Sequence, residues 1–221
     1  GGIIIMKQFQ IRKSDLTAHR LCDLSNDELQ PSDGEILVQV ERFGLSANNV
    51  TYAVTGERIG YWKFFPASGS DADEWGVVPV WGFADVTESR APGIDVGERL
   101  FGYFPPATQL KMNPTDISAG HLFDGSDHRA ELPRGYNIYR RVAAEPDYSR
   151  AGDNLRMLLY PLYITAFVLW DQLKENGWYG AEQIILTSAS SKTSIGLAYA
   201  LQGDDDAPEV IGMTSEGNRD F

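Results

Sequence analysis

Hydroxyl side chains crowd one short stretch of the chain, residues 187–194, which reads TSASSKTS. An apolar, β-branched run precedes it at Ile184–Leu186, and an apolar-periodic segment follows it at Ile195–Leu201. This order predicts a strand, a turn of small residues and a helix. Such a turn aims backbone N–H groups and the positive end of the helix at an anion. The chemistry that these residues predict is the binding of a nucleotide phosphate.

A second strand is expected at Glu209–Thr214, after the predicted helix, as a βαβ unit requires. Serine and threonine hydroxyls can donate hydrogen bonds where glycines would expose amides, and Lys192 adds a cation. Gly196 stands where the helix is expected to pack closely on the strand. The candidate phosphate contacts are Thr187, Ser188, Ser190, Ser191, Lys192, Thr193 and Gly196.

The turn departs from both familiar phosphate-binding patterns. Small residues replace the first two glycines of the dinucleotide fingerprint G-x-G-x-x-G, and only Gly196 remains. Lys192-Thr193 resembles the end of a P-loop, but Ser191 and Leu186 occupy positions where that motif requires glycine, which disfavours a triphosphate-hydrolysing site. The stretch can also be read as an ordinary strand-to-helix turn capped by serine.

Composition excludes several classes of function. The chain has 221 residues with a net charge of −12, and 43% of them are hydrophobic, so it can form one large domain or two small ones. The negative charge argues against nucleic acid or an anionic membrane as the main partner, although a local site can still bind an anionic cofactor. Cys22 is the only cysteine in the sequence, which rules out an intramolecular disulfide and a cysteine-rich zinc lobe.

The two ends carry no recognisable targeting segment. No apolar run approaches the ~20 residues of a membrane span, and Ile3–Met6 is too short for the core of a signal peptide. Cytoplasmic residence is the expectation. The first methionine is Met6, and the chain closes at Phe221 just after the second predicted strand. A doubly wound sheet needs further β–α units, so we expect a longer polypeptide.

Residues 7–140 are dense in turn formers and lack long helical periodicity, which predicts a small, irregular β-barrel. Alternating and apolar runs predict strands at Glu35–Arg42, Val77–Val80, Phe83–Val86 and the end of Asp95–Phe104. Residues 105–140 are rich in Pro, Asp, Gly and His and are expected to form an extended loop or lobe.

The character of the sequence changes at Asn154. Apolar residues recur at helical spacing over Asn154–Glu175, and Pro161 is expected to divide this stretch into two helices. A β-barrel, a helical hinge and a βαβ unit predict a two-domain α/β protein. We place the barrel domain at residues 1–150 and the hinge with an incomplete second domain at residues 151–221.

Several segments together resemble the medium-chain dehydrogenase/reductase superfamily, in particular its zinc-free, quinone-reductase-like branch and, within it, the family DUF2855. They are GEILVQVERFGLSANNVTYAVTG (34–56), VPVWGFADV (78–86), DVGERLFGYF (95–104), LYPLYITAFVL (159–169) and ILTSASSKTSIGLAYAL (185–201). The resemblance implies a GroES-like barrel followed by a Rossmann-type domain, here truncated, with a substrate cleft between the two domains. It also leaves a homodimer open as the oligomeric state.

The resemblance implies metal-free chemistry. Zinc members of the superfamily carry a cysteine and a Gly-His-Glu triplet at two catalytic positions, which correspond here to Ser46 and Gly82-Phe83-Ala84. Without a thiolate and an imidazole at these positions, that zinc site cannot be assembled. The implied reaction is direct hydride transfer from a nicotinamide to a small-molecule substrate.

The cofactor preference is expected to depend on the end of the second strand. A carboxylate there favours NAD by binding the ribose 2′-hydroxyl. This chain offers Thr214 and Ser215 as uncharged donors and Arg219 as a cation for a 2′-phosphate, a pattern similar to NADPH-preferring quinone reductases. We therefore favour NADPH over NADH. Glu216 reverses the preference if it faces the ribose in place of Ser215, and the segment can also be a solvated loop.

The barrel carries the candidate catalytic residues. The resemblance places Asn48 and Asn49 near the nicotinamide, where either amide can hold the carboxamide or ribose. Tyr52 can donate a proton or hydrogen bond to a substrate carbonyl oxygen as hydride arrives. The structural alternative is that the asparagines cap a short helix and that Tyr52 fills the barrel, with its hydroxyl at the surface.

Other polar and aromatic residues have two interpretations. Tyr61, Trp62, Phe64 and Phe65 suit a planar quinone-like or enone substrate, but they can equally belong to the lid of the core. His128 is either an acid/base group or a surface histidine satisfied by Asp127.

We favour a zinc-independent oxidoreductase that uses NADPH to reduce a small carbonyl, enone or quinone. The alternative is an NADP(H)-binding sensor or scaffold without catalysis.

Overall fold

The computed structural model describes residues 6–220, so Ile3–Ile5 of the N-terminal apolar segment and Phe221 lie outside the described residues. The chain divides into two compact units, Gly1–Asn154 and Leu155–Phe221. No helix of the described chain combines the length and the apolarity needed to cross a bilayer.

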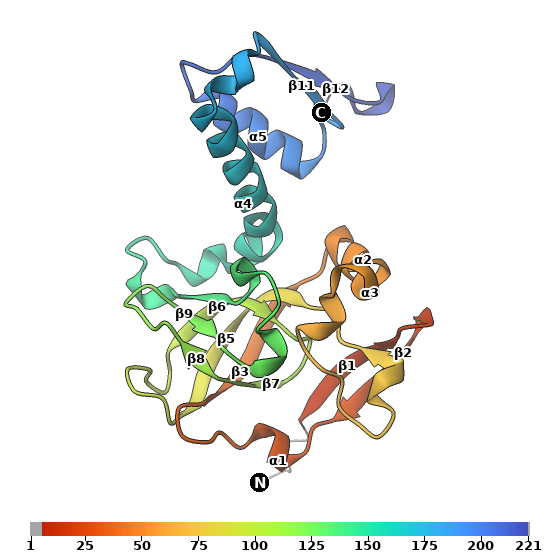
Figure 1. Cartoon of the computed structure of the whole chain (residues 1–221), viewed down its shortest axis with the longest axis vertical. Coiled ribbons are helices and arrows are strands. Elements are labelled where there is room, and N and C mark those ends of the chain that lie inside the picture. The colour runs from red at the N-terminus through yellow and green to blue at the C-terminus, as the bar shows by residue number, and fades with distance from the viewer. Residues whose placement is uncertain (1–5, 221) are drawn as a thin grey trace. The chain divides into compact units, whose positions relative to one another are not determined.

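A barrel-like antiparallel sheet forms most of the first unit (Figure 1). Its strands, in sheet order, are β7 (Gln109–Met112), β3 (Ile36–Gly44), β5 (Val80–Ser89), β6 (Arg99–Phe104), β10 (Ile138–Arg141), β9 (His121–Asp124) and β8 (Pro114–Thr115). A smaller sheet has the order β2 (Asp15–Asp23), β1 (Lys7–Arg12) and β4 (Trp75–Gly76). The first unit is therefore the predicted β-barrel.

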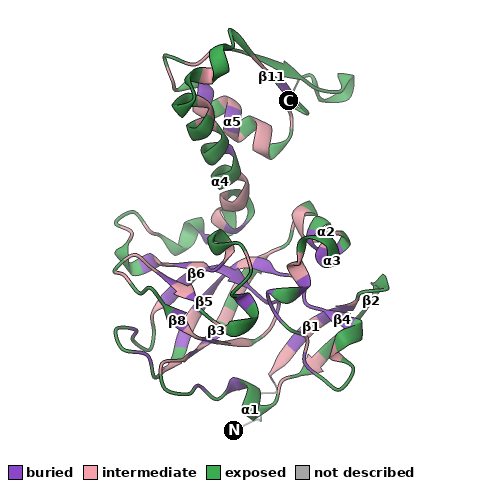
Figure 2. Cartoon of the chain, in the orientation of Figure 1, coloured by how far each residue is buried: buried purple, intermediate pink, exposed green. Residues whose placement is uncertain are grey.

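The barrel core forms where alternate residues of these strands point inward. Every residue of β6 is buried, and Ile36 and Val38 of β3 are fully buried with Leu100 of β6. Gly102 has no side chain because a Cβ there would lie 2.5 Å from the ring of Tyr139. Figure 2 shows this concentration of buried positions along β5 and β6.

The helices of the chain are α1 (Asn26–Leu29), α2 (Ala47–Val54), α3 (Gly56–Ile59), α4 (Asp153–Glu175) and α5 (Lys192–Gln202). Short 3₁₀ helices connect other elements, at Tyr61–Lys63, Ala72–Glu74, Asp127–Arg129, Arg134–Tyr136, Val142–Ala144, Arg150–Gly152, Gly177–Gly180 and Glu216–Asn218.

Three local predictions were wrong. Val77–Val80 is not a strand, because β4 ends at Gly76 and β5 begins at Val80, after Pro79, which has no N–H to donate to a ladder. Residues 105–140, expected to form an extended loop or lobe, contain β7, β8, β9 and part of β10, which belong to the barrel sheet. Pro161 does not divide the helical stretch, since α4 runs without interruption from Asp153 to Glu175. Proline removes one hydrogen bond from a helix, and the residues on both sides keep the helical conformation.

The second unit contains the predicted βαβ arrangement. β11 (Gln183–Thr187) and β12 (Glu209–Met213) pair in parallel, with Gln183 opposite Glu209 and Thr187 opposite Met213, and α5 connects them. Its core consists of Ala166, Leu186, Leu197 and Leu201. The contact expected for Gly196 was wrong: the nearest atom to a Cβ there is the Cβ of Ala166 on α4, at 3.2 Å, so the glycine lets two helices approach and not a helix and a strand.

Candidate nucleotide-binding pocket

Ser188 adopts the backbone conformation that glycine provides in other phosphate turns. Its φ is +50°, in the left-handed region where an L side chain is strained by about 1–2 kcal/mol. The N–H of Ser191 donates to the carbonyl of Ser188 at 2.8 Å and closes the turn. The chain thus keeps the tight turn of the dinucleotide fingerprint without its glycine.

Helix α5 begins directly after this turn. Ser191 is the N-cap, and its hydroxyl accepts from the N–H of Ser194 at 3.3 Å. The Ser194 hydroxyl in turn donates to the carbonyl of Thr187 at 3.1 Å. The N–H groups of Lys192 and Thr193 belong to the first turn, where no earlier helical carbonyl can accept from them. They are available to an anion, which the helix dipole also favours.

The turn lies close against the end of β12. The N–H of Ala189 donates to the carbonyl of Met213 at 2.9 Å, and the hydroxyl oxygens of Ser190 and Thr214 lie 3.0 Å apart. A Cβ on Gly212 would lie 3.0 Å from the Cβ of Ala189, so a larger residue would push the turn away. Small residues on both sides are what allow this approach.

A cavity of about 520 Å³ lies at the carboxyl ends of β11 and β12. It is lined by Thr187, Ser188, Ser190, Ser191, Met213, Thr214, Ser215 and Asn218. The carboxyl ends of parallel strands are where open α/β sheets bind ligands. The structure thus brings together residues of the predicted turn and residues of the segment after β12.

Four predicted contacts do not line this cavity: Lys192, Thr193, Gly196 and Arg219. Arg219 Nε instead donates to Asp220 at 3.3 Å. Asn218 lines the cavity although the sequence analysis did not select it, because the 3₁₀ turn Glu216–Asn218 returns it toward the strand ends. Ser215 lines the cavity and Glu216 does not.

The donors of the cavity fit a phosphate. Its lining contains no carboxylate that would repel an anion, and its hydroxyl and amide groups can donate to phosphate oxygens. Among the described residues, no group of three or more His, Cys, Asp or Glu side chains could hold a metal ion.

The predicted asparagines of the barrel unit lie on α2. Ser46, and not an asparagine, is the N-cap, with its hydroxyl accepting from the N–H of Asn48 at 3.3 Å. The Asn49 side chain completes a capping box: its Oδ1 accepts from the N–H of Ser46 at 2.8 Å, and its Nδ2 donates to the carbonyl of Pro79 at 3.0 Å. The amide of Asn49 is therefore used to fix the start of α2, and Asn48 is half-buried beside it.

Tyr52 lies in a cluster of aromatic rings and is only 7% exposed. Its ring centroid is 4.6 Å from that of Tyr61 and 5.8 Å from that of Tyr103. Burial raises the pKa of Tyr52 above its usual value, so the hydroxyl keeps its proton at neutral pH. The Tyr61 and Tyr136 hydroxyls lie 3.4 Å apart in the same cluster.

The remaining aromatic candidates belong to the core. Phe64 and Phe65 are each 2% exposed, and Trp62 packs against Gly56 and Gly76, where no Cβ would fit. His128 Nε2 lies 3.1 Å from the carbonyl oxygen of Phe64, so a backbone group is its partner. The histidine thus anchors its loop to the aromatic cluster.

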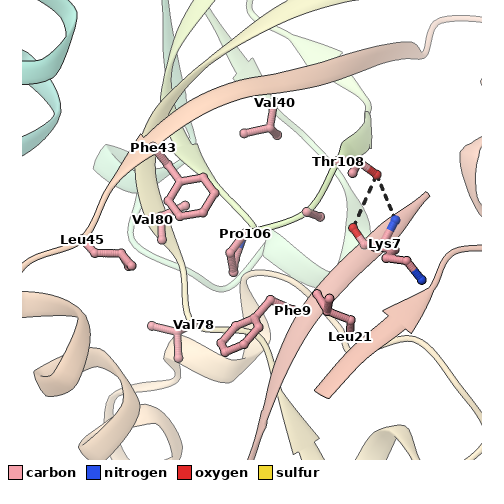
Figure 3. Close-up of a pocket in the computed structure, with 11 residues that line it drawn as sticks. Lys7, Phe9, Leu21, Val40, Phe43, Leu45, Val78, Val80, Pro106 and Thr108 are labelled. Atoms are coloured by element: carbon pink, nitrogen blue, oxygen red, sulfur yellow. Dashed lines mark hydrogen bonds between the residues drawn. The ribbon is translucent and has the colours of Figure 1, made fainter. Parts of the chain in front are cut away.

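A second cavity, of about 500 Å³, lies in the barrel unit (Figure 3). Lys7, Phe9, Leu21, Val40, Phe43, Leu45, Val78, Val80, Pro106, Ala107 and Thr108 line it. The N–H of Lys7 donates to the Thr108 hydroxyl at 2.9 Å, and Lys7 Nζ pairs with Asp23. Its walls are otherwise apolar, which does not suit a phosphate.

A barrel-like unit followed by a parallel βαβ unit gives the chain the fold of medium-chain dehydrogenases/reductases, in which a GroES-like part precedes a Rossmann-type part. The chain belongs to the DUF2855 family, described as a protein of unknown function, whose model matches residues 43–221. The predicted family and fold are therefore confirmed. Among curated proteins, none matches the sequence.

Solved structures show the same fold at low sequence identity. The chain is similar to CurK enoyl reductase (12% identity, TM-score 0.53), covering 98% of this chain and 56% of that one. It is similar to the quinone oxidoreductase from Coxiella burnetii (14%, TM-score 0.50), with 98% and 58% covered. A 2-haloacrylate reductase matches at 15% with a TM-score of 0.53, with 98% and 54% covered. The chain thus spans little more than half the length of these proteins.

Proposed function

We propose that the protein is a zinc-independent oxidoreductase that uses NADPH to reduce a small carbonyl, enone or quinone compound. The observation that carries the proposal is the hydroxyl-lined cavity at the carboxyl ends of β11 and β12, beside the start of α5. The names of the similar structures, an enoyl reductase, a quinone oxidoreductase and a 2-haloacrylate reductase, support this substrate class.

The proposed cofactor contacts come from the turn and from the segment after β12. The turn residues Thr187, Ser188, Ser190 and Ser191, with the first N–H groups of α5, hold the pyrophosphate. Thr214, Ser215 and Asn218 hold the adenosine ribose and its 2′-phosphate. Lys192 and Arg219 contribute charge from outside the cavity lining, and Gly196 keeps α5 close to α4.

The barrel residues are proposed to orient and protonate the substrate. When bound, the reduced nicotinamide supplies a hydride. Tyr52 donates a hydrogen bond or proton to the substrate oxygen, which its protonated state at neutral pH supports. Asn48 holds the carboxamide or ribose, while Asn49 positions α2 through its bonds to Ser46 and Pro79. The position that corresponds to the zinc-binding cysteine is occupied here by Ser46, whose hydroxyl caps α2. We therefore propose a structural role for Ser46.

Two measurements test the proposal. Titration of the protein with NADPH, followed by nicotinamide fluorescence, should show saturable binding that is tighter than for NADH. Loss of reduced-nicotinamide absorbance should then occur with a panel of quinones and enones and should survive dialysis against a chelator. Tyr52→Phe should keep NADPH affinity and lower turnover by about 10²-fold or more. Absence of NADPH binding refutes the proposal, and unchanged turnover in Tyr52→Phe removes the proton-donor role.

An NADP(H)-binding sensor or scaffold without catalysis is the second candidate. The burial of Tyr52 among aromatic rings favours it, because the proton donor of a reductase must reach its substrate. NADPH binding without turnover across the whole panel would support this second function.

A further inference from the structure

The hydroxyl pair between Ser190 and Thr214 joins the two segments that form the cavity. The two oxygens lie 3.0 Å apart, and either can be the donor. Each hydroxyl has one proton, so one proton of the pair is used between them. The other proton is left for a third group.

Two neighbouring hydroxyls, those of Ser191 and Ser194, are already engaged. Ser191 donates to the hydroxyl of Ser194 at 3.1 Å, and Ser194 donates to the carbonyl of Thr187 at 3.1 Å. Both protons are therefore used to hold the turn and the helix start. The Ser190–Thr214 pair differs because it retains a proton that can point into the cavity.

We propose that Thr214 is a positioning residue that acts on the cofactor pyrophosphate through Ser190, an inference that rests on the proposed function. A phosphate oxygen accepts hydrogen bonds and cannot donate them. Since the proposed function places the pyrophosphate at the turn that carries Ser190, Ser190 donates to the phosphate and Thr214 donates to Ser190. A hydroxyl that accepts one bond becomes a stronger donor in the next.

We call the two successive hydrogen bonds, from Thr214 to Ser190 and from Ser190 to the phosphate, the relay. The backbone holds its two hydroxyls in place before any ligand binds. The Ala189–Met213 hydrogen bond of 2.9 Å ties together the residues directly before Ser190 and Thr214. The absence of a side chain at Gly212 lets Ala189 approach, so the same two segments can lie close together. The two hydroxyls therefore meet without further ordering when the phosphate arrives.

The relay also assigns the cofactor's ribose contacts. Once Thr214 donates to Ser190, its oxygen offers only lone pairs to the rest of the ligand. A lone pair suits a ribose hydroxyl and repels a phosphate. The donors for a 2′-phosphate must then be Ser215 and Asn218, which line the same cavity.

A double-mutant cycle tests the relay by calorimetric titration with NADPH and, separately, with inorganic pyrophosphate. Ser190→Ala should weaken binding of both probes by about tenfold, as expected for a lost hydrogen bond to an anion. Thr214→Val should weaken pyrophosphate binding by about threefold in the natural background and not at all in the Ser190→Ala background. Thr214→Ser, which keeps a hydroxyl, should retain the original affinity.

Thr87→Val is the matched control, because it removes an exposed threonine hydroxyl of the barrel unit, bonded to the carbonyl of Leu37, and should leave both affinities unchanged. Thermal melting of each variant verifies that it is folded. Additive losses in the double variant, or pyrophosphate binding unchanged by Thr214→Val alone, refute the relay while leaving the cofactor site intact. If the unmodified protein binds neither probe, the proposed function and the relay both fail.

Discussion

The two units differ in how far their polar groups are buried. In the barrel unit, Arg129 is completely buried, and its guanidinium donates to Asp124, Tyr139 and Asn137. In the second unit, most hydroxyls of the candidate pocket are exposed and neutral, and the Ser190 and Thr214 hydroxyls bond to each other. Besides its apolar core, one unit contains buried charged groups, and the other presents neutral donors to solvent.

This difference indicates separate roles for the two regions. Removing one partner of a buried ion pair leaves an uncompensated charge, so the barrel unit is expected to lose stability when such a pair is broken. Exposed hydroxyls can exchange water for a phosphate at little desolvation cost, which suits a site that binds and releases a cofactor. Variants in each unit can test whether substitutions in the first unit mainly change stability and whether those in the second unit mainly change ligand binding.

The largest effect is expected at Arg129. The side chains of Arg129 and Asp124 are 0% and 2% exposed. Arg129→Met removes the guanidinium and leaves Asp124 as a buried carboxylate without its cation. The free energy of unfolding should fall by about 3–5 kcal/mol, as measured by urea denaturation. Arg134→Met is the matched control: its bond to Asp116 is exposed, so the loss should stay well below 1 kcal/mol. Equal losses in the two variants would mean that buried charge does not hold the barrel together.

A smaller effect is expected at Ser188. Because its φ is +50°, Ser188→Val should destabilise the second unit by about 1–2 kcal/mol, since a β-branched side chain is strained there. Ser188→Gly relieves the strain and should be neutral or slightly stabilising. Thermal melting of both variants measures the difference. If valine and glycine behave alike, the turn does not have the left-handed conformation and the likeness to the dinucleotide fingerprint is lost.

The second unit could be predicted from sequence because its signals are local. The strand, turn and helix follow one another over Ile184–Leu201, and the structure places β11, the turn and α5 there. The polar cavity contact that sequence reasoning missed, Asn218, depends on a 3₁₀ turn, whereas charge alone had favoured Arg219. The sequence shows which residues follow the end of β12, but not which of their side chains the turn places in the cavity.

The sequence predicted the fold class of the barrel unit but not all of its strands. The alternation of Glu35–Arg42 predicted β3 well, because a half-buried strand of nine residues has a clear period of two. β8 has two residues and β9 has four, which is too short for a period to appear. Arg99 attracted no notice in the sequence, since two of its three carboxylate partners, Glu41 and Asp153, are 58 and 54 residues away.

The smallest effect is expected from pH at Glu41, in the charged network of the barrel. Hydrogen bonds from Arg42 and then Arg99 lower the pKa of Glu41 to about 2, against a partial opposing effect of burial. A carboxyl whose pKa is depressed in the folded state stabilises the fold above its unfolded value of about 4.5 and loses that contribution as pH falls toward 2.

Glu41→Gln should therefore be less stable than the natural protein at pH 5 by about 1 kcal/mol, after screening of the partly exposed Arg42 pair. This difference should shrink steadily when urea unfolding is repeated from pH 5 down to pH 3. Lys192→Met in the second unit is the comparison: this lysine is exposed and forms no ion pair with a carboxylate of residues 6–220, so its effect on stability should not vary over that range. A Glu41→Gln effect that is independent of pH would mean that the glutamate contributes by packing and not by charge, and the contrast between the charged barrel and the neutral pocket would then rest on the buried arginines alone.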